Sequence, residues 1–238
     1  MTVTPYANDG SKREQVERMF DRISPRYDLL NRLLSLGIDQ RWRRRVVRRL
    51  GRDRVQHLLD VATGTGDLAI MAAGRVPRVT GADISAGMLE QGRRKVAARG
   101  LQDRITLQQA DSVQLPWPDG TFDAVTVAFG VRNFAELERG IAEMRRVLRP
   151  GGMLHVLEFS KPRRTPFKQL FRFYFHRVMP FVGRLVSRDP AAYTYLPESV
   201  EAFPEGPAFV AILARCGFHE AHAHALTGGV ATHYTARK

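Results

Sequence analysis

A glycine turn between an apolar run and a helix-forming run constrains this chain more than any other feature. Residues 57–62 are apolar enough for a strand that is covered on both faces of a parallel sheet. Gly64 and Gly66 follow, and glycine permits a positive φ and lets a ligand approach the backbone with no Cβ in the way. Residues 67–73 then favour a helix. A ligand at this turn would face backbone N–H groups and the positive end of that helix.

Three acidic residues indicate which ligand the turn binds. Asp60 lies at the end of the first predicted strand, Asp83 ends a second and Asp111 ends a third. An acid about 20 residues beyond such a turn can accept hydrogen bonds from both hydroxyls of a ribose. Acids at three strand ends favour a cationic ligand that carries adenosine over an anionic pyrophosphate. The sequence therefore predicts a site for S-adenosylmethionine, which has an ammonium, a sulfonium, a ribose and an adenine.

Runs that favour strands and runs that favour helices alternate along the chain. Such alternation implies right-handed βαβ units, in which helices join parallel strands. Two runs around the Gly228-Gly229 turn predict a terminal antiparallel hairpin. We therefore expect a doubly wound, mostly parallel, Rossmann-like sheet of seven strands, at 57–62, 78–82, 104–110, 122–128, 153–159, 219–226 and 230–237.

Helices are expected between these strands. One follows the glycine turn, another begins with Ser85 as its N-cap, and two more cover 136–148 and 207–216. The sequence Pro150-Gly151-Gly152 is expected to turn the chain into the fifth strand.

The first 52 residues are interpreted as a helical extension, and residues 53–238 as the main domain. An aromatic and basic helical insertion is expected at about 161–200, with a break at Met179-Pro180 and a proline-punctuated loop at 189–197. Three helices are expected in the extension: 11–24 with Ser11 and Glu14 as a capping box, 27–36 stopped by Gly37, and 40–50 capped by Asp39.

The charge and the cysteine content limit the compartment and the partners. A formal net charge of +13 favours nucleic acid or the negative face of a membrane. Cys216 is the single cysteine, residues 1–10 are polar, and no apolar run reaches the length of about 18 residues that spans a bilayer. These features indicate a cytoplasmic protein. The basic residues form two clusters: Arg41, Arg43, Arg44, Arg45, Arg48 and Arg49; and Lys161, Arg163, Arg164, Lys168, Arg172 and Arg177, the latter interleaved with Phe167, Phe171, Phe173, Tyr174 and Phe175.

Several motifs together resemble the class I methyltransferases that C-methylate the ring of menaquinone and ubiquinone precursors. The resemblance runs from about residue 13 to the C-terminus. The motifs that begin at Tyr27, Phe129 and Leu157 are the most specific to this group. The motifs are Tyr27-Asp28-x-x-Asn31, Leu36-Gly37-Ile38-Asp39-x-x-Trp42-Arg43, the stretch from Leu59 to Asp67, Phe129-Gly130-Val131-Arg132-Asn133, Arg146-Val147-Leu148-Arg149-Pro150-Gly151-Gly152, and Leu157-Glu158-Phe159-Ser160-Lys161-Pro162.

The resemblance implies cofactor contacts at the glycine turn, at the ribose and near the adenine. The chain departs from the family at Asp111-Ser112, where Asn-Ala is common, and at Ala128, where a serine is common and only a backbone contact remains. No metal is expected, because His and Cys residues are not grouped at ligand spacing. The candidate cofactor residues are Asp60, Thr63, Gly64, Thr65, Gly66, Asp83, Ile84, Met88, Asp111, Ser112 and Ala128.

The implied reaction transfers the sulfonium methyl group to a ring carbon of a polyprenylated hydroquinone, and demethylmenaquinol is the favoured acceptor. The ring carbon is a weak nucleophile until the adjacent hydroxyl loses its proton, so a cation near that oxygen would help. We expect Arg132 in this role, Asn133 as a group that orients the ring, and Tyr27 and Asp28 over the site. Loop, capping and surface roles remain open alternatives for these residues.

The acceptor's isoprenoid tail lies in a bilayer, so the enzyme is expected to meet an anionic membrane, as a peripheral protein at the inner face of the plasma membrane. The aromatic and basic segment 167–181, together with the arginine cluster 41–49, could supply an apolar lid over the site and electrostatic attraction to anionic lipid. A benzoquinol acceptor, dual specificity for both rings and a different small-molecule acceptor are alternatives for the substrate. A homodimer is possible for the oligomeric state. A basic RNA-modifying protein is the rival class, although no nucleic-acid partner is expected because no recognition motif is present.

Overall fold

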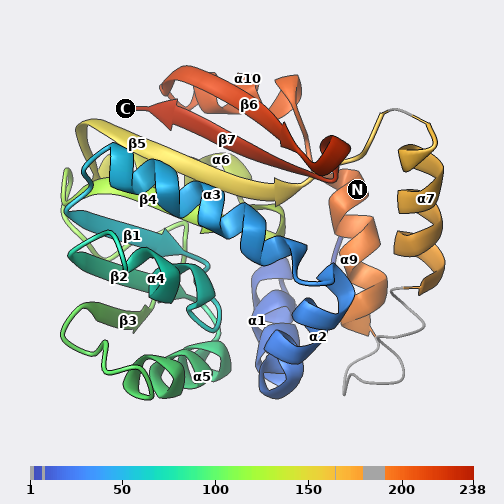
Figure 1. The fold of residues 1–238 in the computed structure, drawn as a ribbon, viewed down its shortest axis with the longest axis horizontal. Helices are drawn as coiled ribbons and strands as arrows, with labels where there is room; N and C mark the ends of the chain where they lie inside the picture. Colours follow the sequence, from blue (N-terminus) through green and yellow to red (C-terminus); the bar gives the residue numbers. More distant parts are fainter. Residues whose placement is uncertain (1–2, 7–8, 164, 179–190) are drawn as a thin grey trace.

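A computed structural model describes residues 3–6, 9–163, 165–178 and 191–238. Its centre is a seven-stranded sheet in the order β3-β2-β1-β4-β5-β7-β6 (Figure 1). The first five strands run parallel to one another, and β7 is antiparallel to both β5 and β6. The predicted doubly wound sheet with a terminal hairpin is therefore confirmed. The strands are β1 (His57–Val61), β2 (Arg78–Asp83), β3 (Ile105–Gln109), β4 (Phe122–Ala128), β5 (Leu148–Phe159), β6 (His219–Leu226) and β7 (Ala231–Arg237).

Helices cover both faces of this sheet, because strands such as β1 and β4 bury side chains on both sides. One apolar core lies between the sheet and α3 (Ile38–Arg52), α4 (Asp67–Ala72) and α5 (Ala86–Ala97). The other lies between the sheet and α6 (Leu137–Val147) and α10 (Pro207–Arg215). Ser85 caps α5 as predicted, accepting a hydrogen bond from the Met88 N–H at 3.1 Å.

A third apolar cluster lies beyond the end of the sheet, at the right of Figure 1. It joins α1 (Lys12–Ile23), α2 (Tyr27–Ser35) and α9 (Ala191–Ala202), and Met19, Leu30 and Tyr195 are buried in it. A short 3₁₀ turn (Ser24–Arg26) joins α1 to α2, and α7 (Phe167–Phe173) runs on into a π-helical turn (Tyr174–Val178) beside them. These helices form a cap, and the name is kept below.

The predicted capping box at the start of α1 is present, but the prediction for Asp39 is wrong. Gly37 takes the N-cap position of α3 with a φ of 73°, so the helix begins at Ile38 and Asp39 lies inside its first turn. Glycine adopts this left-handed conformation at little cost, and Leu36 and Gly37, with φ values of 50° and 73°, form the two-residue junction between α2 and α3. Asp39 is thereby free to pair with Arg43 in the next turn.

Two further expectations were wrong in detail. The predicted loop at 189–197 is helical over its described part, because α9 contains Pro197 and packs Tyr195 against the cap; the lost backbone bond at proline is outweighed by this burial. The chain does not turn into β5 at Pro150-Gly151-Gly152, since β5 already pairs with β4 at Leu148 and passes a register shift there. Residues 179–181, 189, 190 and Arg164 lie outside the described residues.

Two buried histidines face each other across β5 and β7. The rings of His155 and His233 are stacked with centroids 5.4 Å apart, and His155 Nδ1 lies 3.2 Å from His233 Nε2. Burial and, to a smaller extent, the charges of His224, Arg45 and Arg49 together lower the pKa of His233 to about 4. Burial likewise holds the pKa of His155 well below its usual value.

We expect these histidines to make folding weaker in acid. An unfolded histidine binds a proton near pH 6.5, while His233 stays neutral to about pH 4, so its contribution is complete above pH 6.5 and is lost as the pH falls toward 4. The free energy of unfolding should lose about 3 kcal/mol from His233 over this range. Urea unfolding from pH 7 to 4 measures the free energy of unfolding of the wild type, of His233→Gln and of the exposed control His219→Gln. Subtracting each variant from the wild type at the same pH removes the contribution of the other titrating groups. A pH-independent difference between wild type and His233→Gln would contradict this expectation.

Candidate active site

The glycine turn connects β1 to α4 and is tied to Asp60. Gly64 and Gly66 have φ values of 58° and 77°, so the conformation that the sequence requires of them is present. Asp60 is 1 % exposed and accepts hydrogen bonds from the hydroxyls of Thr63 and Thr126, both at 2.7 Å. Burial raises the pKa of Asp60 to about 6, although these hydrogen bonds oppose the shift.

Asp83 holds the same turn from the neighbouring strand. Its carboxylate accepts hydrogen bonds from the N–H of Gly64 at 2.7 Å and of Ser85 at 2.9 Å. Burial raises its pKa to about 6 as well, against the effect of these backbone donors. Two carboxylates that can take up or release a proton near neutral pH therefore lie on either side of the turn.

The third predicted acid lies at the edge of the site. Asp111 accepts a hydrogen bond from Arg13 Nε of α1 at 2.5 Å, and Ser112 follows it at the end of β3. The Ile84 carbonyl accepts a bond from Gln109 Nε2 at 2.9 Å, and Met88 is buried against the cap. Arg13 was not predicted, because the pairing of α1 with the end of β3 is not visible in the sequence.

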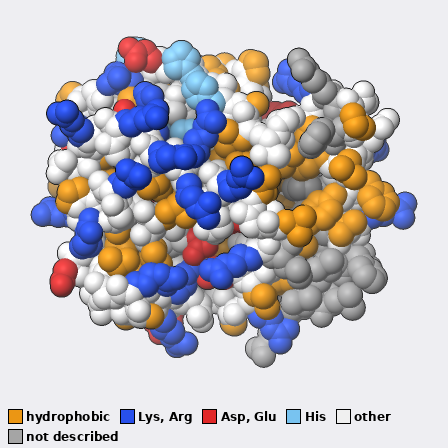
Figure 2. Space-filling view, in the orientation of Figure 1, with side chains coloured by type: hydrophobic (Ala, Val, Ile, Leu, Met, Phe, Trp, Pro, Cys, Tyr) orange, Lys and Arg blue, Asp and Glu red, His pale blue; other side chains and the backbone are white. Residues whose placement is uncertain are grey.

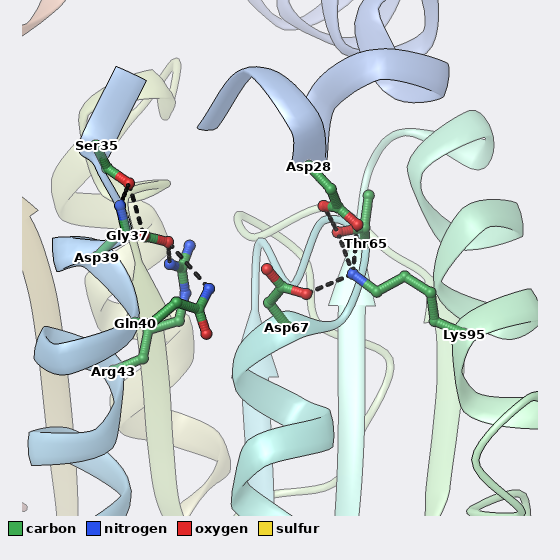
Figure 3. A network of polar contacts seen from close by, with 9 residues as sticks. All are labelled: Asp28, Ser35, Gly37, Asp39, Gln40, Arg43, Thr65, Asp67 and Lys95. Atoms are coloured by element: carbon green, nitrogen blue, oxygen red, sulfur yellow. Dashed lines mark hydrogen bonds and ion pairs between the residues drawn. The ribbon is translucent and has the colours of Figure 1, made fainter. Parts of the chain in front are cut away.

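A polar network joins the cap to the glycine turn (Figure 3). Asp28 of α2 accepts hydrogen bonds from the hydroxyl of Thr65 and from Lys95 Nζ of α5, both at 2.6 Å. Lys95 also pairs with Asp67 at the start of α4. Asp28 was expected over the catalytic site, and the structure places its carboxylate in this network. Lys95 and Asp67 were missed, because a lysine near the end of a helix carries no signal of its function.

Two hollows adjoin each other beside the carboxyl ends of β1 and β4. A small pocket of about 20 Å³ lies over the glycine turn, and a larger cavity of about 700 Å³ lies under the cap. Tyr27 and Arg43 contribute to the walls of both. The small pocket is also lined by Asp60, Ala62, Thr63, Gly64, Thr65, Asp67, Leu68 and Ala128.

The larger cavity is mainly apolar, with a few polar groups in its wall. Arg132 Nη1 donates to Glu158 Oε1 at 2.8 Å, and both side chains are buried. Asn133 is 7 % exposed, and its Oδ1 finds no hydrogen-bond partner among the described residues. Most of the apolar lining comes from the cap, from α3 with the turn before it, and from the ends of β4 and β5; it includes Met19, Phe20, Ile23, Leu34, Leu36, Trp42, Phe129, Phe159, Leu170, Phe171, Phe173, Ala192, Tyr195 and Leu196.

The predicted site residues therefore fall into three groups. The small pocket brings together Asp60, Thr63, Gly64, Thr65, Ala128 and Tyr27, and the larger cavity brings Tyr27 together with Arg132 and Asn133. The remaining predicted residues lie outside both linings; they are Asp28, Gly66, Asp83, Ile84, Met88, Asp111 and Ser112.

The lining of the small pocket fits a cationic adenosine ligand, since it contains the buried carboxylate of Asp60, the partly exposed carboxylate of Asp67 and the backbone at Gly64, with Asp83 bound to the Gly64 N–H behind it. Its volume of about 20 Å³ is well below the roughly 300 Å³ of a small-ligand site, so it holds only part of such a ligand as it stands. A Cβ on Gly64 would lie 4.0 Å from Tyr27 Cε1, which shows how closely the cap covers the turn.

A seven-stranded sheet with an antiparallel β7 and an acid-flanked glycine turn at its carboxyl edge defines a class I S-adenosylmethionine-dependent methyltransferase. A sequence model of the ubiE/COQ5 methyltransferase family matches residues 8–238, and the chain belongs to this family. The family predicted from the motifs is thus confirmed.

Curated relatives agree with this assignment over nearly their full length. The demethylmenaquinone methyltransferase of Bacteroides fragilis is 48 % identical and covers 99 % of this chain and 97 % of its own. That of Thermus thermophilus is 54 % identical over 90 % of this chain and 96 % of its own. A protein of Geotalea daltonii named ubiquinone/menaquinone biosynthesis C-methyltransferase UbiE is 47 % identical over 95 % and 97 %.

Solved structures share the fold at low sequence identity. A putative S-adenosyl-L-methionine-dependent methyltransferase of Methanococcus maripaludis has a TM-score of 0.62 at 18 % identity, and covers 98 % of this chain and 96 % of its own. A methyltransferase of Thermotoga maritima has a TM-score of 0.64 at 16 % identity, over 93 % and 99 %. The cap region is therefore included in structural matches of nearly full length.

We expect affinity for S-adenosylmethionine to fall in acid. Asp60 and Asp83 carry charge above a pH of about 6, and their protonation removes the negative partners of a cationic ligand. The dissociation constant should rise about tenfold or more from pH 7 to pH 5, which corresponds to about 1.4 kcal/mol. Calorimetric titration measures it. Asp83→Asn should bind weakly with a flatter pH dependence, while Asp103→Asn, at an exposed loop carboxylate, should behave as wild type. Equal affinity at both pH values would contradict the assignment.

Proposed function

We propose that this protein C-methylates the ring of a polyprenylated hydroquinone, converting demethylmenaquinol to menaquinol. The observation that carries the proposal is the large apolar cavity that shares Tyr27 and Arg43 with the small pocket over the glycine turn. A methyl donor in the small pocket and an apolar aromatic acceptor in the larger cavity would meet at that shared wall. The names of the relatives from Bacteroides fragilis and Thermus thermophilus support the menaquinone acceptor.

The bound cofactor supplies a methyl group whose bond to sulfur breaks as the ring carbon forms its new bond, with the electron pair left on sulfur and a proton lost from the ring. The electrophile is activated already, so the protein's task is alignment and charge. Thr63, Gly64 and Thr65 with the acids of β1 and β2 would hold the cofactor. The apolar wall of the cavity would exclude water from the reacting atoms.

The four predicted catalytic residues would act differently. Tyr27 would separate and align the two ligands, and burial raises its pKa, which keeps the phenol protonated. Asn133 would orient the ring through its unpartnered Oδ1. Arg132 would add positive charge to the cavity wall from its pair with Glu158, and Asp28 would hold the cap over the cofactor through Thr65.

Access from a membrane surface follows from the acceptor's tail. No helix in the described part of the chain has the length and apolar character needed to cross a bilayer. Figure 2 shows basic side chains over α3 and apolar side chains to their right, where α7 and α9 lie in Figure 1. Leu36, Leu170 and Phe173 are 86 %, 66 % and 62 % exposed and line the cavity. We propose that this side docks on the inner face of the plasma membrane as a peripheral contact.

A benzoquinol is the second acceptor to be considered. The name of the Geotalea daltonii relative includes ubiquinone biosynthesis, and a cavity of about 700 Å³ has room for either ring. Dual specificity is therefore part of the test below.

We expect the purified protein to methylate short-tail demethylmenaquinol at a ring carbon. The assay combines chemically reduced acceptor with S-adenosylmethionine and identifies the product by mass spectrometry, with the matching demethyl benzoquinol and a transfer RNA pool as rival acceptors. Asp83→Asn should lower activity about tenfold or more at limiting cofactor, since it weakens cofactor binding. Methylation of RNA with none of either quinol would overturn the proposal.

We expect binding to anionic vesicles that weakens as salt rises. The exposed arginines of α3 at 41, 44, 45, 48 and 49 face the lipid charge, and each contributes about 1 kcal/mol near the surface. Sedimentation with phosphatidylglycerol vesicles measures the bound fraction, and neutral phosphatidylcholine vesicles provide the control. Leu170→Ser with Phe173→Ser should reduce binding, whereas Arg139→Gln on α6 should not. Salt-independent binding, or none, would contradict the docking proposal.

A further inference from the structure

Arg43 occupies a place in the site that the motifs did not assign to it. It lies in the second turn of α3, is 7 % exposed, and forms part of the wall of both hollows. Its guanidinium carbon lies 5.2 Å from the centroid of the Phe129 ring. A buried cation therefore stands at the boundary where the methyl donor and the acceptor ring would meet.

The N–H groups of Arg43 are largely unused. A guanidinium carries five N–H donors, and among the described residues Asp39 is the one hydrogen-bond partner of this side chain. Arg132, the arginine that the sequence favoured, uses three of its donors, on Glu158, on the Phe129 carbonyl and on the Ser199 hydroxyl. No nitrogen of Arg43 is among the buried unpartnered atoms of the described residues, so its free N–H groups open on the cavity, where an acceptor atom of a ligand can reach them.

The partner of Arg43 is itself held by other donors (Figure 3). The Ser35 hydroxyl donates to Asp39 Oδ1 at 2.7 Å, and Gln40 Nε2 donates to Asp39 Oδ2 at 3.2 Å. These bonds fix the carboxylate from the end of α2 and the start of α3. They also satisfy part of its charge, so the guanidinium is oriented by Asp39 and keeps positive potential for a second anion.

We propose that Arg43 is a catalytic residue that donates hydrogen bonds to the ring oxygen of the acceptor and stabilises it as an oxyanion. The step is ionisation of the acceptor's hydroxyl: the O–H bond breaks, its electron pair stays on oxygen, and the proton passes to solvent. The adjacent ring carbon thereby becomes nucleophilic. Asp39 is the positioning residue for Arg43. The inference rests on the proposed quinol acceptor and names the group that activates it.

The direct test measures ionisation of a bound acceptor analogue without any turnover. A redox-stable naphthol with a short prenyl chain is bound to the cofactor-free protein, and the absorbance of its naphtholate is followed against pH. A nearby opposite charge lowers a pKa by about 1–3 units. Wild type and Arg43→Lys should therefore lower the naphthol pKa relative to free naphthol, and Arg43→Gln should return it to the free value or above.

The pH dependence of kcat for short-tail demethylmenaquinol provides the second measurement. Arg43→Gln should lower kcat about ten- to a thousandfold near pH 7, with recovery toward wild type as the pH rises past the pKa of the acceptor. The double variant Asp39→Asn with Arg43→Gln removes both charges of the buried pair, so no unpaired charge is left to hinder folding. The pKa of naphthol bound to this variant should be as high as in Arg43→Gln. Arg52→Gln, an exposed arginine at the end of α3, is the matched control and should match wild type.

The outcomes separate the two proposals. Quinol methylation by wild type with the same bound naphthol pKa in wild type and Arg43→Gln would overturn the role of Arg43 alone. A loss of kcat that is equal at every pH would also overturn it, because a structural defect is not rescued by ionising the acceptor in solution. Absence of quinol methylation by wild type would overturn the proposed function.

Discussion

The burial of two carboxylates, those of Asp60 and Asp83, determines which hydrogen-bond donors must lie around the glycine turn. Asp60 and Asp83 end neighbouring parallel strands, so the sheet brings them to one edge. Each buried acid needs donors, and these come from two threonine hydroxyls and from backbone N–H groups of the turn and of α5. The glycine turn is thus held between the two acids.

The cap depends on this edge but packs on a core of its own. Its buried residues contact one another and Met88 of α5, while its polar link to the turn passes through Asp28, Thr65 and Lys95. The ion pairs in this link are partly exposed, and such pairs contribute about 1 kcal/mol or less. The polar link is therefore weak, and the apolar contacts of the cap with Met88 contribute more to holding it in place.

Two buried arginines in one cavity differ by how many of their donors are already used. Arg132 is bound to fully buried Glu158, to a carbonyl and to a hydroxyl, so removal of its side chain would leave that carboxylate with backbone N–H donors but without its charged partner. Arg43 has one partner among the described residues and a place on both hollows. A structural role thus suits Arg132 more closely, and a role toward ligands suits Arg43.

The sequence by itself determined the sheet, the glycine turn, the capping of α1 and α5, and the family, because these depend on local periodicity, on glycine's freedom of φ and on motifs contiguous in the chain. Only the tertiary structure decided the start of α3 at Ile38, the helix through Pro197, the place of Asp28 beside Lys95, and the place of Arg43 in the wall of both hollows. These depend on which helix faces meet and on which donors find acceptors there. Such contacts join residues far apart in the chain, and the spacing of residue types does not encode them.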